Sequence, residues 1–95
     1  MGYQELDAHL VAPKRFVTLA YLLQVEQADY TALQEATGLS TPDLSKIVRD
    51  LEERGLVLVS KERKNRYVNT MVRLSSDGQT QFKQLLRTLN RVAGQ

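Results

Sequence analysis

One segment constrains the fold more than any other, because it carries both a start and a stop signal for a single helix. It spans residues 39–55, with the sequence LSTPDLSKIVRDLEERG. Ser40 or Thr41 can cap the helix with a side-chain oxygen, and Pro42 suits the first turn, where its missing N–H costs no hydrogen bond. The final glycine can adopt the left-handed conformation that ends helices. The segment therefore predicts a helix over residues 41–54.

This predicted helix has two unlike faces. Apolar side chains recur at the i, i+3, i+4, i+7 spacing of a core face, at Leu44, Ile47, Val48 and Leu51. The opposite face is small, hydroxylated and basic, at Pro42, Ser45, Lys46 and Arg49. Such a face suits a helix that enters the DNA major groove, and it equally suits the solvated side of a core helix. The segments that follow it favour DNA.

A shorter helix is predicted directly before this one. Residues 31–37 are expected to be helical, with Leu33 and Ala36 facing inward, after a very short strand that holds Tyr30. Gly38 can end the helix in the left-handed conformation. Two helices joined by a tight glycine turn predict a helix-turn-helix.

The N-terminal part of the chain contains an unusual charge pattern. Residues 1–12 are expected to hold a short helix, and a second helix should run from Pro13 to about Val25. Lys14 and Arg15 stand in its first turn, where positive charge opposes the helix dipole. Either an acidic partner in the fold or dimer, which we favour, or a DNA phosphate would explain them.

A β-hairpin is predicted after the central helix. Residues 56–60 and 67–74 are β-branched and apolar, with Val68, Thr70, Val72 and Leu74 on one face of the second strand. Asn65 can turn the chain between them. The tip carries four cations and one glutamate; the cations are Lys61, Arg63, Lys64 and Arg66. A solvated turn would also be charged, but this excess leaves cations free to reach phosphates. A helix-turn-helix followed by a hairpin is the winged-helix layout.

The last helix is predicted to begin after a Ser75 or Ser76 cap and to run over residues 77–93. Its apolar stripe is long for a small domain and consists of Phe82, Leu85, Leu86, Leu89 and Val92. Part of it is expected to pack against a partner chain. The other side of the helix carries a basic stripe, which we interpret as solvated surface: Lys83, Arg87 and Arg91.

Length and composition fit one domain and exclude several functions. We expect a mainly α fold with a small β-hairpin wing and a C-terminal dimerisation helix, divided into an N-terminal segment (about 1–12), a winged helix (13–74) and a terminal helix (75–93). The chain has no cysteine, and its lone His9 has no partner of the kind that metal or catalytic sites need. We therefore expect no enzyme, metal or cofactor. The net charge is only +2, so DNA binding must depend on where the charges lie.

Four stretches carry a family resemblance: 13–16, 30–39, 44–57 and 74–78, within residues 6–92. The most specific one reads leucine, a small residue, a basic residue, then leucine, two glutamates, any residue, glycine and an apolar residue. On these motifs the chain resembles compact winged-helix transcriptional regulators of the MarR-like group, near ArsR-type repressors. The resemblance implies a homodimer, built on terminal helices, that binds a pseudo-palindromic operator in double-stranded DNA. We expect a repressor.

The resemblance also assigns residues to each surface. Helix 41–54 would enter the major groove and the wing, residues 60–67, would lie on the backbone. The DNA-binding residues would be Thr41, Pro42, Ser45, Lys46, Arg49, Lys61, Arg63, Lys64 and Arg66. The dimer interface would comprise Leu6, Leu10, Phe82, Leu85, Leu86, Leu89 and Val92.

The sequence differs from the pattern of these regulators in two respects, and it leaves one alternative function open. The wing tip lacks the expected glycine, and the terminal helices are shorter than those that form effector clefts in larger relatives, so a small-molecule effector is unsupported. The alternative is a winged-helix module for protein–protein interaction without DNA binding. No apolar run reaches the roughly 20 residues of a membrane span, so we expect a cytoplasmic protein, associated with the nucleoid when bound to DNA.

Overall fold

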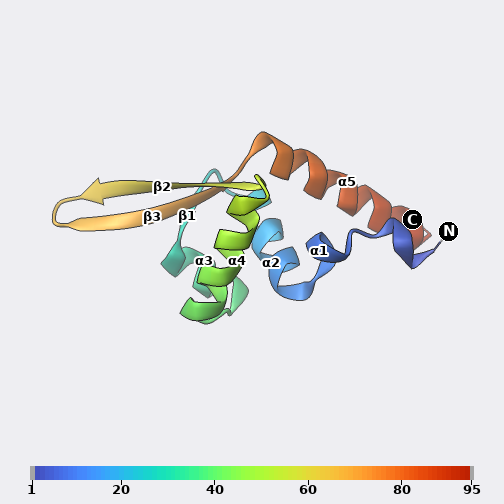
Figure 1. Cartoon of the computed structure of the whole chain (residues 1–95), viewed down its shortest axis with the longest axis horizontal. Helices are drawn as coiled ribbons and strands as arrows, with labels where there is room; N and C mark the ends of the chain where they lie inside the picture. Colours follow the sequence, from blue (N-terminus) through green and yellow to red (C-terminus); the bar gives the residue numbers. More distant parts are fainter. Residues whose placement is uncertain (1, 95) are drawn as a thin grey trace.

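Residues 2–94, which the computed structural model describes, form five α-helices, a short 3-10 helix and a three-stranded antiparallel sheet. In chain order the elements are η1 (Tyr3–Glu5), α1 (Ala8–Val11), α2 (Pro13–Leu23), β1 (Ala28–Asp29), α3 (Tyr30–Thr37), α4 (Thr41–Glu53), β2 (Val57–Lys64), β3 (Tyr67–Leu74) and α5 (Ser76–Val92). The helices gather into a body from which the β2–β3 hairpin projects (Figure 1), and the molecule measures 53 × 25 × 22 Å. The predicted mainly α fold with a hairpin wing is confirmed.

Local capping sets where the two longest helices begin. Ser40, rather than Thr41, caps α4, because its hydroxyl oxygen accepts a hydrogen bond from the Asp43 N–H at 3.3 Å. Ser75 caps α5 in the same way, accepting from the Gly78 N–H at 2.9 Å. The boundaries predicted for both helices are correct to within one residue.

The helix-turn-helix is also confirmed, with two local corrections. Gly38 ends α3 in the left-handed conformation, at a φ of 73°. Asp29 caps α3 by accepting from the Ala32 N–H at 2.8 Å, so Tyr30 begins the helix and does not belong to the strand. Ala36 is exposed rather than inward-facing, because it lies in the last turn of α3, where no neighbouring element covers it.

The core joins every α-helix to the base of the sheet. Leu44, Val48 and Leu51 of α4 are buried as predicted, and Ile47 is half-buried. In α2, which ends at Leu23 rather than near Val25, the apolar face meets α5: the ring centroids of Phe16 and Phe82 are 5.3 Å apart. The remaining buried apolar residues are Leu10, Leu19, Leu22, Ala28, Leu33, Leu56, Val57, Val72, Leu74 and Leu85.

The hairpin is longer and its turn tighter than predicted. Strands β2 and β3 pair without interruption from Val57–Leu74 to Lys64–Tyr67, so residues 61–64 belong to a strand and only Asn65 and Arg66 make the turn. Asn65 has a φ of 56°, a left-handed conformation that asparagine tolerates better than most residues. It takes the place of the glycine whose absence the sequence left unexplained.

The first turn of α5 lies directly against the base of the hairpin. The Ser75 hydroxyl donates to the Gly55 carbonyl at 2.6 Å, and the Ser75 N–H donates to the Leu56 carbonyl at 3.0 Å. Gly78 is buried there: a Cβ at this position would lie 2.0 Å from the Leu56 carbonyl oxygen. This close approach of two backbones fixes the hairpin relative to the helical body.

Candidate nucleic-acid interface

The predicted recognition face of α4 lies at the surface. Thr41, Pro42, Lys46 and Arg49 are exposed and Ser45 is half-buried, while the apolar residues of the same helix face the core. The N-terminus of α4, which is the positive end of the helix dipole, is on this exposed side. The residues that were expected to meet DNA are therefore accessible together on one element.

Thr41 also joins α4 to α3, and Ser45 lies near Tyr30 of α3. The Gln34 side-chain amide of α3 donates to the Thr41 hydroxyl at 2.7 Å. Burial raises the pKa of Tyr30, an effect partly offset by a hydrogen bond with Ser45. Gln34 and Tyr30 were not identified from the sequence, since their roles depend on how α3 and α4 face each other.

The acidic residue near the start of α4 is neutralised from another helix. Lys14 Nζ lies 2.9 Å from Asp43 Oδ2. The hydrogen bond from Lys14 and its positive charge, with a smaller contribution from Lys46, hold the pKa of Asp43 below its usual value. The misplaced cation in the first turn of α2 thus has an acidic partner in the fold, the explanation that we favoured.

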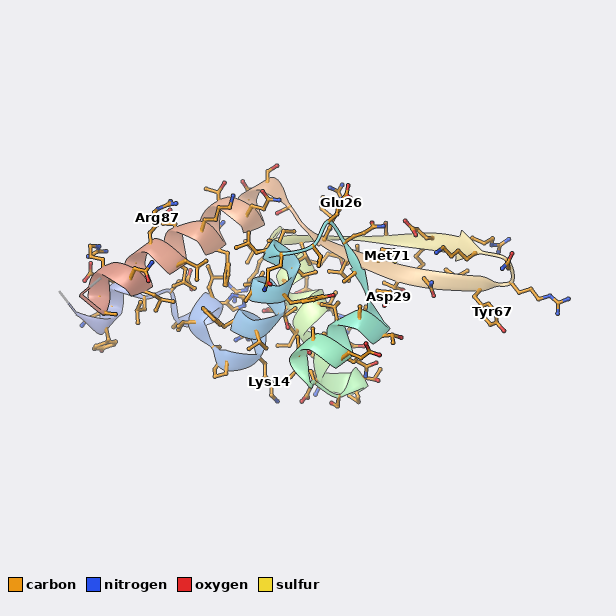
Figure 2. All side chains as sticks on the ribbon, turned by 180° about the vertical axis from the view of Figure 1, so that it is seen from behind. Lys14, Glu26, Asp29, Tyr67, Met71 and Arg87 are labelled. Carbon is orange, nitrogen blue, oxygen red and sulfur yellow. The ribbon has the colours of Figure 1, made fainter. Side chains whose placement is uncertain are left out.

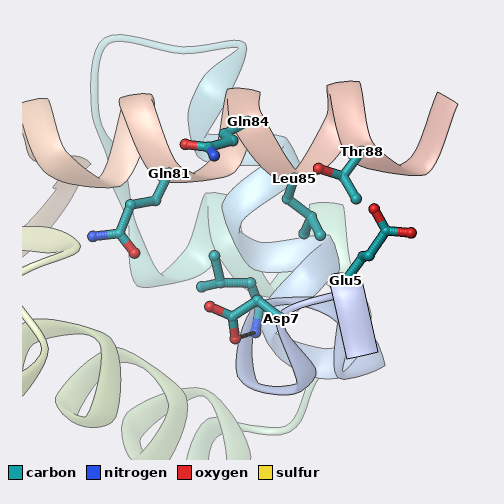
Figure 3. Close-up of a pocket in the computed structure, with 7 residues that line it drawn as sticks. Glu5, Asp7, Gln81, Gln84, Leu85 and Thr88 are labelled. Carbon is teal, nitrogen blue, oxygen red and sulfur yellow. Dashed lines mark hydrogen bonds between the residues drawn. The ribbon is translucent and has the colours of Figure 1, made fainter. Parts of the chain in front are cut away.

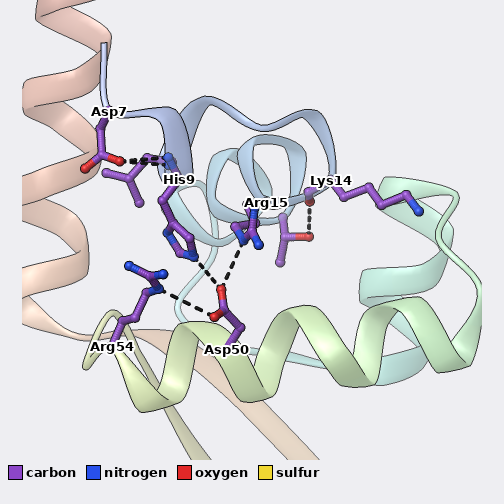
Figure 4. Close-up of polar contacts among 8 residues, drawn as sticks. Asp7, His9, Lys14, Arg15, Asp50 and Arg54 are labelled. Atoms are coloured by element: carbon purple, nitrogen blue, oxygen red, sulfur yellow. Dashed lines mark hydrogen bonds and ion pairs between the residues drawn. The ribbon is translucent and has the colours of Figure 1, made fainter. Parts of the chain in front are cut away.

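Asp50, in the second half of α4, gathers three basic side chains (Figure 4). Arg15 Nε lies 3.0 Å from Asp50 Oδ2, Arg54 Nε lies 3.5 Å from Oδ1, and His9 Nε2 of α1 also bonds to Oδ2. Burial alone would raise the pKa of Asp50, but the hydrogen bonds and charges of His9 and Arg15 lower it below its usual value. His9 therefore ties the N-terminal segment to α4.

The wing carries the second group of predicted DNA contacts. Its four cations are all exposed, at Lys61, Arg63, Lys64 and Arg66. The single glutamate among them, Glu62, accepts a hydrogen bond from the Gln27 side-chain amide at 3.1 Å. Within residues 2–94 no ion pair involves a wing cation, Lys46 or Arg49, whereas Lys14, Arg15, Arg54 and Arg91 are all paired.

The residues predicted for a dimer interface fall into two groups. Leu10, Phe82 and Leu85 are at most 4% exposed within the chain's own core, so they stabilise the fold and are not available to a partner. The periodicity of α5 correctly identified a buried face, but α1 and α2 of the same chain cover much of it. The other four are half-buried, at Leu6, Leu86, Leu89 and Val92.

A cavity of about 220 Å³ lies between α5 and the N-terminal segment (Figure 3), lined by Glu5, Asp7, Leu10, Gln81, Gln84, Leu85 and Thr88. Its two carboxylates already serve the fold. Glu5 Oε1 pairs with Arg91 Nη1 at 2.6 Å, and Asp7 caps α1 by accepting from the His9 N–H at 2.9 Å. The cavity is smaller than common ligand pockets, which run from about 300 to 1,000 Å³.

Residues 2–94 contain no cluster of three or more His, Cys, Asp or Glu side chains that could hold a metal ion. None of the helices in this part of the chain is both long enough and apolar enough to span a membrane.

Comparison with known proteins agrees with the geometry. A family profile described as a winged helix DNA-binding domain matches residues 14–93. The solved structure of a transcriptional regulator homologue from Pyrococcus horikoshii OT3 is 28% identical, with a TM-score of 0.84 over 90% of this chain and 85% of that one. No curated protein sequence matches the chain significantly.

Two more distant structures share the fold. The PcaV transcriptional regulator from Streptomyces coelicolor, solved with its natural ligand, has a TM-score of 0.79 at 20% identity over 93% of this chain and 61% of that one. The transcriptional repressor BigR from Xylella fastidiosa has a TM-score of 0.65 at 23% identity over 88% and 78% of the two chains. The predicted resemblance to winged-helix regulators is confirmed.

Proposed function

The chain belongs to the family of winged helix DNA-binding domains and is a DNA-binding regulator of the MarR-like kind, and from this we propose that it binds a pseudo-palindromic operator sequence-specifically, as a homodimer and a repressor. In this proposal α4 enters the major groove and the wing contacts the backbone of double-stranded DNA. The protein would act in the cytoplasm, associated with the nucleoid when bound, without a catalytic step or cofactor.

The observation that carries the proposal is where the unpaired cations lie: of the nine lysines and arginines without an ion pair in residues 2–94, six belong to the recognition face or the wing. The other three lie on β3 and α5, at Arg73, Lys83 and Arg87. Four basic residues form ion pairs with the protein's own carboxylates: Lys14, Arg15, Arg54 and Arg91. Those of the recognition face and the wing are exposed and have no acidic partner within residues 2–94. Unpaired cations on the exposed face of α4 and on the projecting hairpin suit a polyanion that spans both.

Within this arrangement the residues have different roles. Lys46 or Arg49 would donate to a guanine edge, the commonest direct contact in the major groove, and Ser45 would lie beside them. Thr41, at the positive N-terminal end of α4, would bind a phosphate. The wing cations, being unrestrained by ion pairs, would neutralise phosphates without reading sequence.

The test is a fluorescence-anisotropy titration of the protein into labelled duplex DNA of mixed sequence over a range of salt concentrations. Affinity that falls steeply with salt is expected, because each neutralised phosphate releases counterions. No binding at low salt by a folded protein would contradict the proposal and would favour the protein–protein interaction module instead.

Sequence readout is tested separately with Lys46→Ala. This substitution should cost about 1–3 kcal/mol on an operator selected from random DNA and much less on the random pool. Equal weakening on both would make Lys46 a phosphate contact. Arg87→Ala is the control, since Arg87 lies on α5, away from α4 and the wing (Figure 2).

The homodimer would place two recognition helices about 34–36 Å apart, facing half-sites one helical turn apart. Its interface would use the half-buried apolar residues near the chain ends, of which Val92 lies in the last turn of α5. Val92→Asp should yield monomers in sedimentation, whereas Arg87→Asp on the exposed side of the same helix should not. If the Val92→Asp variant formed a dimer as stable as that of the unsubstituted protein, the interface would have to lie elsewhere on the chain.

A further inference from the structure

The free end of the wing exposes apolar side chains as well as cations. Tyr67 is 74% exposed and lies far from the helical body (Figure 2), and Val68, the next residue of β3, is 52% exposed. Isolated apolar residues are common at protein surfaces, so exposure alone would mean little. What distinguishes these two residues is their register in the hairpin.

The strand register places each apolar side chain directly across from a cation. Tyr67 pairs with Lys64, and Val68 pairs with Arg63. Because side chains alternate along a strand, the first pair lies on one face of the hairpin and the second on the other. Arg66 stands in the turn between the two strands. The tip therefore combines one aromatic ring with positive charge on both faces of the hairpin.

The tip is also held in a defined shape. Ladder pairing continues to Lys64 and Tyr67, and a turn of two residues, started by Asn65 at a φ of 56°, closes it. The only carboxylate nearby in the wing, on Glu62, bonds to Gln27. Tyr67 and its cationic neighbours are thus exposed to a partner, and no carboxylate of the wing forms an ion pair with these cations.

We infer that Tyr67 is a DNA contact of the wing, whose ring packs against a deoxyribose while Lys64 and Arg66 reach the adjacent phosphates. The inference rests on the proposed function. A duplex backbone alternates charged phosphates with largely apolar sugars, and the tip matches this alternation with cations and a ring. A tyrosine ring adds contact area at little conformational cost. The net positive charge of the tip favours this partner over a second protein.

The experiment compares Tyr67→Thr with Tyr67→Phe on mixed-sequence duplex DNA at several salt concentrations. Threonine keeps the β-propensity of the position but removes the ring, and phenylalanine keeps the ring but removes the hydroxyl. Tyr67→Thr is expected to weaken binding about fivefold at every salt concentration with an unchanged salt slope, because the ring is uncharged. Tyr67→Phe should bind within about twofold of the unsubstituted protein.

The matched control is Tyr3→Thr, because Tyr3 is 81% exposed and begins η1, which lies at the opposite end of the molecule from the wing tip (Figure 1). It should leave affinity unchanged, and thermal melts should show that all three variants remain folded. Undiminished affinity of Tyr67→Thr, in a protein that binds DNA, would overturn the inference and leave the proposed function standing. Equal losses for Tyr67→Phe and Tyr67→Thr would also overturn it, since the hydroxyl would then be the contact. Absence of DNA binding by the unsubstituted protein would overturn both.

Discussion

Val72 and Val68 lie on the same face of β3, and their environments are opposite. Val72, near the base of the hairpin, is 0% exposed, whereas Val68, four positions closer to the tip, is 52% exposed. At the base, Ala28 of β1 pairs with Val72, and α2, α3 and α5 cover the strand. Nothing in residues 2–94 covers the tip.

The comparison shows that one hairpin serves two purposes. Its base belongs to the core and is stabilised by apolar burial, while its tip depends on the β2–β3 ladder and a single turn. Substitutions at the base should therefore change the free energy of unfolding. Substitutions at the tip should leave it nearly unchanged and alter binding instead.

The largest effect is expected where the base meets α5. Gly78→Ala would place a Cβ 2.0 Å from the Leu56 carbonyl oxygen, and neither backbone can move without disturbing the other. We expect the free energy of unfolding to fall by about 3 kcal/mol, as in severe overpacking. Urea denaturation followed by circular dichroism would measure it. Gln79→Ala, at the next and exposed position of α5, is the control and should be within about 0.5 kcal/mol of the unsubstituted protein.

The valine pair tests the comparison most directly. Val72→Ala removes two buried methyl groups and leaves a cavity, so we expect a loss of about 2 kcal/mol in the free energy of unfolding. Val68→Ala removes the same atoms from an exposed site and should cost less than about 0.5 kcal/mol. Similar losses for both, measured in the same urea titration, would mean that the tip is packed like the base.

A smaller and more local effect is expected at the turn. Asn65→Ala puts a residue with a Cβ and no compensating polar side chain at a φ of 56°, at a cost of about 1 kcal/mol. The hairpin end should fray while the core stays folded. Because this fraying relieves most of the strain, hydrogen exchange should accelerate at the Lys64 and Tyr67 amides with only a small fall in the thermal midpoint. Asn65→Gly, which tolerates the same φ, should not show this acceleration.

Much of this architecture could be predicted because its signals are local. The Ser40 cap and the apolar spacing of α4 lie within one helix, and Gly38 marks the turn before it. The alternation in 67–74 identified the second strand of the wing. It did not identify where burial stops along that strand, because Val68 and Val72 look alike in sequence and differ only in what packs above them.

The sequence was less informative where the answer depends on distant partners. Lys14 and Asp43 are 29 positions apart, and Arg15 and Asp50 are 35 apart, so the ion pairs could be anticipated but their partners could not be named. The stripe on α5 was likewise visible as a buried face, but no periodicity reveals that Phe82 packs on Phe16 of the same chain. Which side chains are left for a partner becomes apparent only after the core is assembled.

The smallest effect is expected from a single charge at the tip. Lys64→Ala should leave stability unchanged and reduce the salt slope of DNA binding by about one, because one phosphate contact is lost. The difference in affinity from the unsubstituted protein should then change only about threefold between about 50 and 200 mM salt. Anisotropy titrations across that range would measure it, preferably on random DNA, since a phosphate contact reads no sequence.

Glu62→Ala is the matched control, because Glu62 is the one carboxylate among the wing cations and it bonds to Gln27 rather than to any of them. Removing it deletes no phosphate contact, so the salt slope should not fall. An equal fall in slope for Lys64→Ala and Glu62→Ala would mean that the shape of the hairpin, rather than its free charge, determines binding. The tip would then be as much a structural element as the base, and the contrast between Val68 and Val72 would describe packing alone.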